Sequence, residues 1–223
     1  MTDVLVVAAH PDDEALGCAG TIAKYVNEGD KVFIAFMADG VGSRDSNTGE
    51  GVKVRRESAL RSSKILGAED PIFFEFPDNQ MDTVPFLSLV KKIEEVVNSV
   101  EPFVVYTHHS GDLNIDHRLT HQAVMTACRP IPDHSVKKIL SFEVLSSTEW
   151  ASAGSDNAFV PNCFVDISST IDQKIEALKA YQHEMREFPH SRSIDTVIAL
   201  ARYRGASSGR SAAEAFFVER EIL

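Results

Sequence analysis

The sequence is poor in cysteine and in positive charge. Its cysteines, Cys18, Cys128 and Cys163, are odd in number and widely separated, so they indicate neither a disulfide framework nor a CxxC metal site. We expect buried structural thiols. Lysine and arginine number 22 against 33 acidic residues, which gives a net charge of -11. Nucleic acids and anionic membrane surfaces attract basic patches, so this balance argues against both as partners and favours a small molecule.

The sequence also lacks a long hydrophobic run and a basic segment ahead of its first apolar stretch. The run from Val4 to Ala9 is far too short to span a bilayer, and Met1-Thr2-Asp3 carries no positive charge. We therefore expect neither a signal peptide nor a membrane helix, and a cytoplasmic protein. No repeat, low-complexity tract or break in composition divides the chain, which predicts a single domain over residues 1–223.

Strand-like apolar runs alternate with amphipathic helical patterns along the chain. Strands are expected at residues 4–9, 31–37, 71–76, 103–107, 138–145 and 163–167. Helices are expected at residues 15–26, 53–66, 85–99, 116–128 and 171–187. Residues 38–51 form a long loop, and the tail from residue 203 combines a Gly/Ser/Arg loop with a helix or last strand at 212–221. This alternation predicts an α/β Rossmann-like fold, a mostly parallel sheet with helices on both faces.

Charge is concentrated in the pentapeptide His10-Pro11-Asp12-Asp13-Glu14, directly after the first expected strand. In open α/β sheets, ligands bind beyond the carboxyl ends of the strands, which is where this segment lies. The helix dipole stabilises acids in the first turn by about 0.3–1 kcal/mol each, so helix capping is one interpretation. Capping does not account for His10 or for two adjacent aspartates, and a metal site is the other interpretation.

A second segment with histidine and aspartate, Gly111 to His117, follows the fourth expected strand and begins another helix. Imidazole and carboxylate suit zinc, and a catalytic zinc site uses three protein ligands and keeps a position for water. His10, Asp13 and His117 would supply that set, and they would equally suit another divalent metal. His121, one helical turn after His117, is the alternative ligand because positions i and i+4 share a helix face.

Together with Asp116-His117-Arg118 and the C-terminal Ala213-Glu214-Ala215-Phe216, the pentapeptide resembles the PIG-L/LmbE-like zinc de-N-acetylases. The resemblance covers nearly the whole chain, including residues 55–67, 76–79, 181–184 and 189–193. It implies hydrolysis of an N-acetyl amide on an amino sugar, a sugar nucleotide or a glycoside, with release of acetate and a free amine. The small N-acetylated substrate would be the main partner, and the family's tendency to assemble also suggests a homo-oligomer.

The resemblance assigns roles within the expected site. His10, Asp13 and His117 would bind zinc, and Asp12 would be the general base that takes a proton from water. Neighbouring residues in a tight turn project apart, so one carboxylate can reach the metal while the other reaches the water. Asp116 would orient a neighbouring group by hydrogen bonding, with a helix N-cap as the simpler interpretation. Glu14 keeps the role of a helix-start or supporting acid.

Asn114 departs from the family pattern. Many members carry histidine at this position, and that histidine is assigned to the oxyanion or to proton transfer. An asparagine amide can donate a hydrogen bond to an oxyanion but cannot shuttle a proton at neutral pH. The proton donor therefore stays open, with His108, His109 and His190 as candidates.

Residues elsewhere are candidates for substrate contacts. Arg55 matches a substrate-contacting arginine of the family, with a solvated helix face as the alternative interpretation. His190 and Arg192, in a proline-containing loop, would bind hydroxyls or a phosphate unless that loop is a simple surface turn. His183 and Glu184 fall on the preceding expected helix and could equally be exposed.

Two other functions are weighed against the same sequence features. A metal-dependent amidohydrolase that acts on a thiol conjugate or an acylated antibiotic precursor would need the same residues. A nucleotide-binding module without hydrolysis is disfavoured, because the first strand lacks the G-x-G-x-x-G turn and three acids would repel a pyrophosphate.

Overall fold

The computed structural model describes residues 2–43, 49–152, 154 and 158–223. The strands within these ranges are β1 (Asp3–Ala8), β2 (Lys31–Ala38), β3 (Ile72–Phe76), β4 (Val104–His108), β5 (Lys138–Phe142), β6 (Cys163–Asp166) and β7 (Ala213–Glu221). The α-helices are α1 (Asp13–Asn27), α2 (Gly49–Leu66), α3 (Phe86–Val100), α4 (Ile115–Ala127), α5 (Ile171–Ala180) and α6 (Ile194–Ser208). Two 3-10 helices are η1 (Met81–Thr83) and η2 (Thr148–Trp150).

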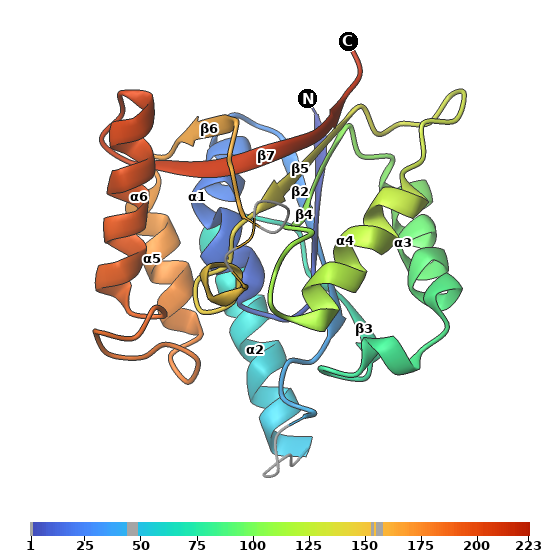
Figure 1. Ribbon diagram of the computed structural model, residues 1–223, viewed down its shortest axis with the longest axis horizontal. Coiled ribbons are helices and arrows are strands. Elements are labelled where there is room, and N and C mark those ends of the chain that lie inside the picture. Colours follow the sequence, from blue (N-terminus) through green and yellow to red (C-terminus); the bar gives the residue numbers. More distant parts are fainter. Residues whose placement is uncertain (1, 44–48, 153, 155–157) are drawn as a thin grey trace.

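All of these strands belong to one sheet, in the order β3-β2-β1-β4-β5-β7-β6 (Figure 1). β1 to β5 run parallel, and β7 runs antiparallel to both β5 and β6. Figure 1 shows α1, α2, α5 and α6 on one side of the sheet and α3 and α4 on the other. The predicted single α/β domain with a mostly parallel sheet and helices on both faces is confirmed.

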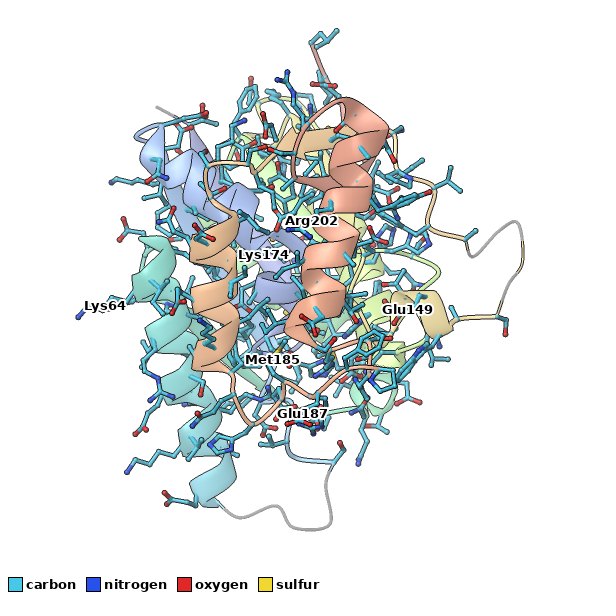
Figure 2. All side chains as sticks on the ribbon, turned by 90° about the vertical axis from the view of Figure 1, so that its left-hand side faces the viewer. Lys64, Glu149, Lys174, Met185, Glu187 and Arg202 are labelled. Atoms are coloured by element: carbon cyan, nitrogen blue, oxygen red, sulfur yellow. The ribbon has the colours of Figure 1, made fainter. Side chains whose placement is uncertain are left out.

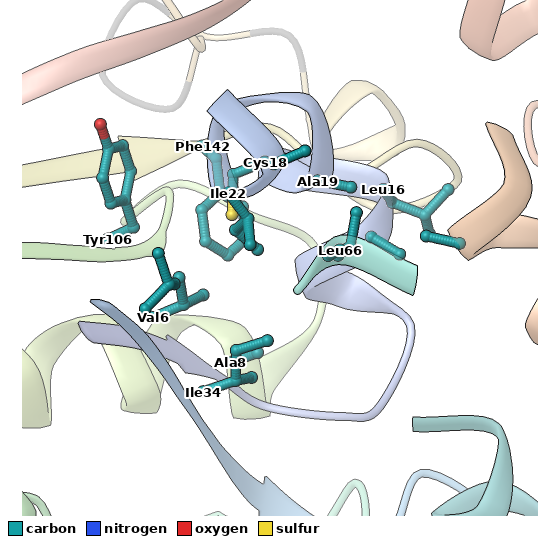
Figure 3. Packing of buried hydrophobic residues seen from close by; sticks show 14 of the residues in the cluster. Val6, Ala8, Leu16, Cys18, Ala19, Ile22, Ile34, Leu66, Tyr106 and Phe142 are labelled. Carbon is teal, nitrogen blue, oxygen red and sulfur yellow. The ribbon is translucent and has the colours of Figure 1, made fainter. Parts of the chain in front are cut away.

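Each face of the sheet buries its own core, because successive side chains of a strand point to opposite faces. Along β1, Val4, Val6 and Ala8 belong to the core that the sheet shares with α1, α2, α5 and α6, whereas the alternate residues belong to the core shared with α3 and α4. Figure 3 shows the first core, in which Phe142 of β5 lies against α1. A Cβ atom at Gly17 would overlap the Phe142 ring, so only glycine allows this approach of helix and strand.

The strand order reverses between β1 and β4. The connection after β1 crosses one face of the sheet through α1, and the connection after β4 crosses the other face through α4. Loops on either side of such a reversal leave a crevice at the carboxyl edge, which is the usual ligand position in open α/β sheets. The acidic pentapeptide and the segment 109–117 therefore meet at this edge.

The C-terminal third differs from the sequence-based prediction. One helix is expected over residues 171–187, but α5 ends at Ala180, and turns carry residues 181–193 before α6 begins. Ser193 starts α6 by accepting a hydrogen bond from the Thr196 amide. Helix α6 runs through part of the expected Gly/Ser/Arg loop. Residues 213–221 form the last strand, one of the two alternatives expected there. Part of the expected loop at 38–51, residues 44–48, lies outside the described residues.

Two of the three cysteines are buried, as expected. Cys18 and Cys128 are fully buried free thiols, and Cys163 is half-buried. Burial raises the pKa of Cys18 well above its ordinary value, which keeps this thiol protonated and unreactive. Among the described residues, no helix is long and apolar enough to cross a membrane.

A buried ion pair joins α5 and β7 to α1. Cys18 has non-helical backbone angles, so α1 bends there and the Leu16 carbonyl loses the Gly20 amide that a regular helix would give it. Lys174 Nζ donates to the Leu16 carbonyl (2.8 Å), and Glu214 Oε1 accepts from the Gly20 amide (3.0 Å). Lys174, labelled in Figure 2, lies 2.6 Å from Glu214, measured from Nζ to Oε1. The pair thus replaces the hydrogen bond that the bend removes.

The Lys174–Glu214 pair gives a stability prediction. In Glu214→Gln the Lys174 ammonium stays buried without its counter-charge, so we expect the free energy of unfolding to fall by about 3–5 kcal/mol in urea denaturation. The matched control is Glu95→Gln, which removes the acid of the exposed Lys92–Glu95 pair and should change stability by less than about 1 kcal/mol. Equal losses in the two variants would contradict a stabilising role for the buried pair.

Candidate metal and active site

The carboxyl edge of the sheet brings the three predicted metal ligands together. His10 and Asp13 lie between β1 and α1, and His117 lies in the first turn of α4. All three are buried, and one ligand atom from each lies within 4.8 Å of the other two. Asp13 Oδ2 is 3.4 Å from His10 Nδ1 and 3.3 Å from His117 Nε2. Two imidazoles and one carboxylate with this convergence match the ligand set of a catalytic zinc ion.

Asp13 supplies an independent sign that a cation fits here. Its Oδ1 atom is buried and has no hydrogen-bond partner among the described residues. A buried carboxylate oxygen without a partner is costly, and a cation held between Asp13 and the two imidazoles would satisfy it. Burial alone would raise the pKa of Asp13, but the neighbouring His117 holds it well below its usual range. The group is therefore an anion suited to bind a metal.

Each of the two histidines has a carboxylate at its other ring nitrogen. His10 Nε2 lies 3.1 Å from Asp78 Oδ1 and 3.1 Å from Asp116 Oδ2. His117 Nδ1 lies 3.1 Å from Asp112 Oδ1. Such carboxylates orient a metal-binding imidazole and make it a better ligand, and they leave His10 Nδ1 and His117 Nε2 facing the centre of the group.

Protons hold these charges together when no metal is bound. Burial lowers the pKa of His117, but the charges of Asp13 and Asp112 outweigh burial and raise it to about 9. Hydrogen bonding to His10 outweighs the effect of burial on Asp78 and lowers its pKa to about 2. A metal would therefore bind to His117 with release of a proton.

Asn114 takes the N-cap position that was the simpler interpretation of Asp116, and Asp116 has the contacts of the orienting carboxylate expected of it. Asn114 is the N-cap of α4: its Oδ1 accepts from the Asp116 amide (2.8 Å), and its Nδ2 donates to Asn79 Oδ1 (2.9 Å). The Asp116 carboxylate accepts from the amides of Asn79 (2.6 Å) and Met81 (3.1 Å) while facing His10. The N-cap interpretation of Asp116 is therefore wrong, and its contacts are those of an orienting carboxylate.

A second group, His10, Asp78 and Asp116, also has three potential ligand atoms within 4.8 Å of one another. The oxygens of Asp116 already accept backbone hydrogen bonds, and Asp78 Oδ2 accepts from Ser43 (2.7 Å). Only the first group contains the unpaired oxygen of Asp13. The first group is therefore the stronger candidate for the metal.

Asp12 occupies a strained turn between β1 and α1. Its φ of 116° lies in a region that residues other than glycine rarely adopt. The Asp12 amide donates to Glu14 Oε2 (3.0 Å), and Glu14 Oε1 accepts from the Tyr181 hydroxyl (2.7 Å). Burial raises the pKa of Glu14 to about 7 even though Tyr181 and the Asp12 amide favour its charged form. Glu14 thus supports the turn that projects Asp12 and Asp13 in different directions.

Two arginines hold the Asp12 side chain. Arg55 Nη1 lies 3.2 Å and Arg192 Nη1 2.9 Å from Asp12 Oδ2, and no described residue donates to Oδ1. Glu184 Oε2 lies 3.1 Å from Arg55 Nη2 and 3.6 Å from Arg192 Nη1. Burial raises the pKa of Asp12 above its ordinary value, although Arg192 and Arg55 act in the opposite direction. Asp12 is therefore a better base than a free aspartate, with one oxygen left for a substrate or water.

Arg55 is buried rather than on a solvated helix face, and Glu184 is buried in the loop after α5 rather than exposed on a helix. His183 is exposed, as one interpretation had it. Arg192 does not lie in an isolated surface turn, because its backbone carbonyl accepts from Arg186 and its guanidinium reaches Asp12.

The remaining histidines differ in what they can do. His108 is fully buried, its Nε2 accepts from the Ala9 amide (2.8 Å), and burial lowers its pKa well below the ordinary value, so that nitrogen carries no proton. His121 Nδ1 bonds to the His108 carbonyl (2.9 Å) and His121 joins neither metal group. His109 packs against Phe159. His190 accepts a hydrogen bond from the Arg192 amide (3.0 Å).

Several supporting residues were missed in the sequence. Asp112 and Asp78 had no assigned role and Glu184 no defined one, although all three lie in segments that were singled out. Ser147 Oγ and Thr148 Oγ1 both donate to Asp112, and Thr148 does so at 2.6 Å. An acid two residues before the helix cap Asn114 is the one signal that pointed to Asp112.

The carboxylate behind His117 gives a prediction for metal affinity. In Asp112→Asn the imidazole loses its charged partner, so we expect zinc affinity to fall by about 10–100-fold in competition titrations with a chromophoric chelator. The control is Asp82→Asn, which changes an exposed acid of η1 in the same way and should leave the affinity unchanged. Wild-type affinity in Asp112→Asn would show that Asp112 does not support a ligand.

Known proteins resemble this chain in sequence. Residues 5–128 match the family model described as PIG-L: GlcNAc-PI de-N-acetylase. The uncharacterized deacetylase YaiS of Escherichia coli is 30% identical over 185 residues, which cover 80% of this chain and 90% of that protein. The diacetylchitobiose deacetylase of Thermococcus kodakarensis is 28% identical over 228 residues, 95% of this chain and 80% of that protein.

A solved structure resembles nearly the whole molecule. The conserved protein TT1542 from Thermus thermophilus superposes with a TM-score of 0.79 at 25% identity, covering 100% of this chain and 97% of that one. The segment matched by the family model contains His10, Asp13 and His117, the three residues that converge at the sheet edge. The resemblance seen in the sequence is confirmed: this chain belongs to the PIG-L family of GlcNAc-PI de-N-acetylases.

Proposed function

We propose that this protein hydrolyses an N-acetyl amide on an amino sugar or glycoside, releasing acetate and a free amine, with zinc held by His10, Asp13 and His117. One observation carries the proposal: a buried His/Asp group with an unpaired carboxylate oxygen lies beside Asp12, a carboxylate of raised pKa. The relatives support the substrate class. The Thermococcus protein is named a diacetylchitobiose deacetylase, and a Bacillus cereus relative is named a probable N-acetyl-alpha-D-glucosaminyl L-malate deacetylase.

A bound zinc ion would supply Lewis acidity, which makes water more acidic and the acetamido carbonyl more electrophilic. Asp12 Oδ1 takes the proton of the attacking water as the new C–O bond forms. Arg55 and Arg192 fix Asp12 through Oδ2, so the free oxygen keeps its orientation during proton transfer. Glu184 offsets the charge of the two arginines and holds them in place.

The same carboxyl group is best placed to return the proton. When the C–N bond breaks, the departing amine needs one proton, and Asp12 holds the proton that it took from water. Asn114 has no acidic proton and caps α4, and His108 Nε2 is occupied by the Ala9 amide. Asp12 would thus act first as base and then as acid, which explains how the site works without a histidine at position 114.

Metal analysis and acetate release test the function. We expect the purified protein to bind one zinc ion and to release acetate from N-acetylglucosamine, N,N'-diacetylchitobiose or a sugar nucleotide that carries N-acetylglucosamine. In Asp12→Asn, turnover should fall by about 10²–10⁴-fold while zinc stays bound, because Asp12 is not a ligand in this arrangement. Asp82→Asn serves as the matched control.

Two results would contradict the proposal at different points. Retained turnover in Asp12→Asn would remove the assignment of the base. Wild-type protein that binds no added zinc and releases no acetate from any of these sugars would remove the function itself.

A further inference from the structure

The sequence contains a single tryptophan, Trp150, and it lies close to this site. Trp150 ends η2 and is 52% exposed. Tryptophan usually buries most of its large apolar surface, so a half-exposed indole is informative. Its ring meets the His190 ring edge-to-face, with centroids 5.7 Å apart. The protein thus holds the indole from one direction and leaves much of it open to solvent.

Hydrogen bonds connect the segment of Trp150 to the base. Arg192 Nε donates to Ser146 Oγ (2.6 Å), and Arg192 Nη1 donates to Asp12 Oδ2 (2.9 Å). Glu149 accepts from the Ser146 amide (2.7 Å), which fixes the turn that carries Trp150. In Figure 2, Glu187 lies below the lower end of α6 and Glu149 lies beside it. Trp150 therefore stands at the edge of the site, one side chain outward from the arginine that touches Asp12.

The same segment has a connection to the metal group. Ser147 and Thr148, directly before Trp150, both donate to Asp112, which faces His117. The position of the indole is thus set by residues that also position a predicted metal ligand. Trp150 is tied to the site on two sides, through Arg192 and through Asp112.

His190 adds a hydrogen-bond donor beside the indole. Its Nδ1 accepts from the Arg192 amide (3.0 Å), so the neutral ring carries its proton on Nε2. Arg192 adds the N–H groups of Nη2, since its Nε and Nη1 donate to Ser146 and Asp12. An apolar face and donors therefore lie side by side, which is the usual composition of a small-molecule site.

We propose that Trp150, His190 and Arg192 form a subsite for a second pyranose ring, linked to the N-acetylated sugar on which the site acts. The inference rests on the proposed function and extends it from one sugar ring to two. A pyranose has an apolar face of C–H groups, which packs on an aromatic ring, and a rim of hydroxyls, which accept from N–H donors.

Charge favours a neutral sugar over a phosphorylated group at this position. Arg192 already faces Asp12 and Glu184, so its positive charge is compensated. A phosphate bound there would meet those two carboxylates as well as the overall charge of -11. A ring that offers hydroxyls avoids this repulsion.

The single tryptophan allows direct detection of binding. Chitobiose, the two-ring amine, carries no acetyl group and can be titrated into the zinc-loaded wild-type protein while tryptophan emission is recorded. We expect a saturable change of emission with chitobiose, and half-saturation with glucosamine at a concentration about tenfold higher, because one ring lacks the stacking contact. Emission that stays unchanged throughout the chitobiose titration would overturn the subsite.

Substitutions test the same contact through kinetics. In Trp150→Ala, the KM for N,N'-diacetylchitobiose should rise by about tenfold relative to the KM for N-acetylglucosamine, with a smaller change in kcat. Trp150→Phe retains an aromatic face and should recover most of this ratio. Phe103→Ala removes another exposed aromatic ring, at the amino-terminal end of β4, and is the matched control. An unchanged ratio in folded Trp150→Ala would overturn the proposal.

The two tests separate the subsite from the function. If no N-acetylated sugar yields acetate, the proposed function fails, and the emission titration with chitobiose decides the subsite without turnover. If acetate is released but neither the emission nor the KM ratio responds, the subsite fails while the deacetylase activity stands.

Discussion

The buried carboxylate of Asp13 is the charge that the rest of the site compensates. It is almost inaccessible to water, and one of its oxygens lacks a partner among the described residues. Two imidazoles face it, and a carboxylate at the outer nitrogen of each ring leaves the other nitrogen pointing inward. Charges thus alternate from the centre outward, which lets a protein keep many ionisable groups in a dry interior. A cation and the protons of the two histidines would compete for the same inward-facing ring nitrogens, His10 Nδ1 and His117 Nε2.

A second set of charges surrounds Asp12, and it is built from distant parts of the chain. Arg55 comes from α2, Arg192 and Glu184 come from the loop after α5, and Tyr181 secures Glu14 below the turn. The base therefore depends on the docking of a loop that is not part of the sheet. The strained φ of Asp12 is tolerated because hydrogen bonds on both sides of the turn fix it.

Much of the fold and the central group could be predicted, because the strongest signals are local. Continuous apolar runs give the parallel strands, and His10, Asp13 and His117 stand directly after strand ends, where topology brings them together. The end of α5 could not be predicted, because the helical pattern continues beyond Ala180 while Tyr181 and Glu184 are drawn into tertiary contacts. The sequence could not show that Asn114 rather than Asp116 caps α4, since either residue type can cap a helix. The amides of Asn79 and Met81, which bind the Asp116 carboxylate, come from a distant part of the chain.

The set of charges around Asp12 includes residues from a later stretch of the chain that contributes nothing to the candidate metal group. Every residue of the metal group lies before position 128, whereas Glu184 and Arg192 and the Lys174–Glu214 pair that joins α5 and β7 to the bent α1 all come later. Substitutions in the later stretch can therefore change how the base is held, or which molecule rests against it, without touching a metal ligand. In such an architecture the candidate metal ligands and the later residues that hold Asp12 can vary independently of one another.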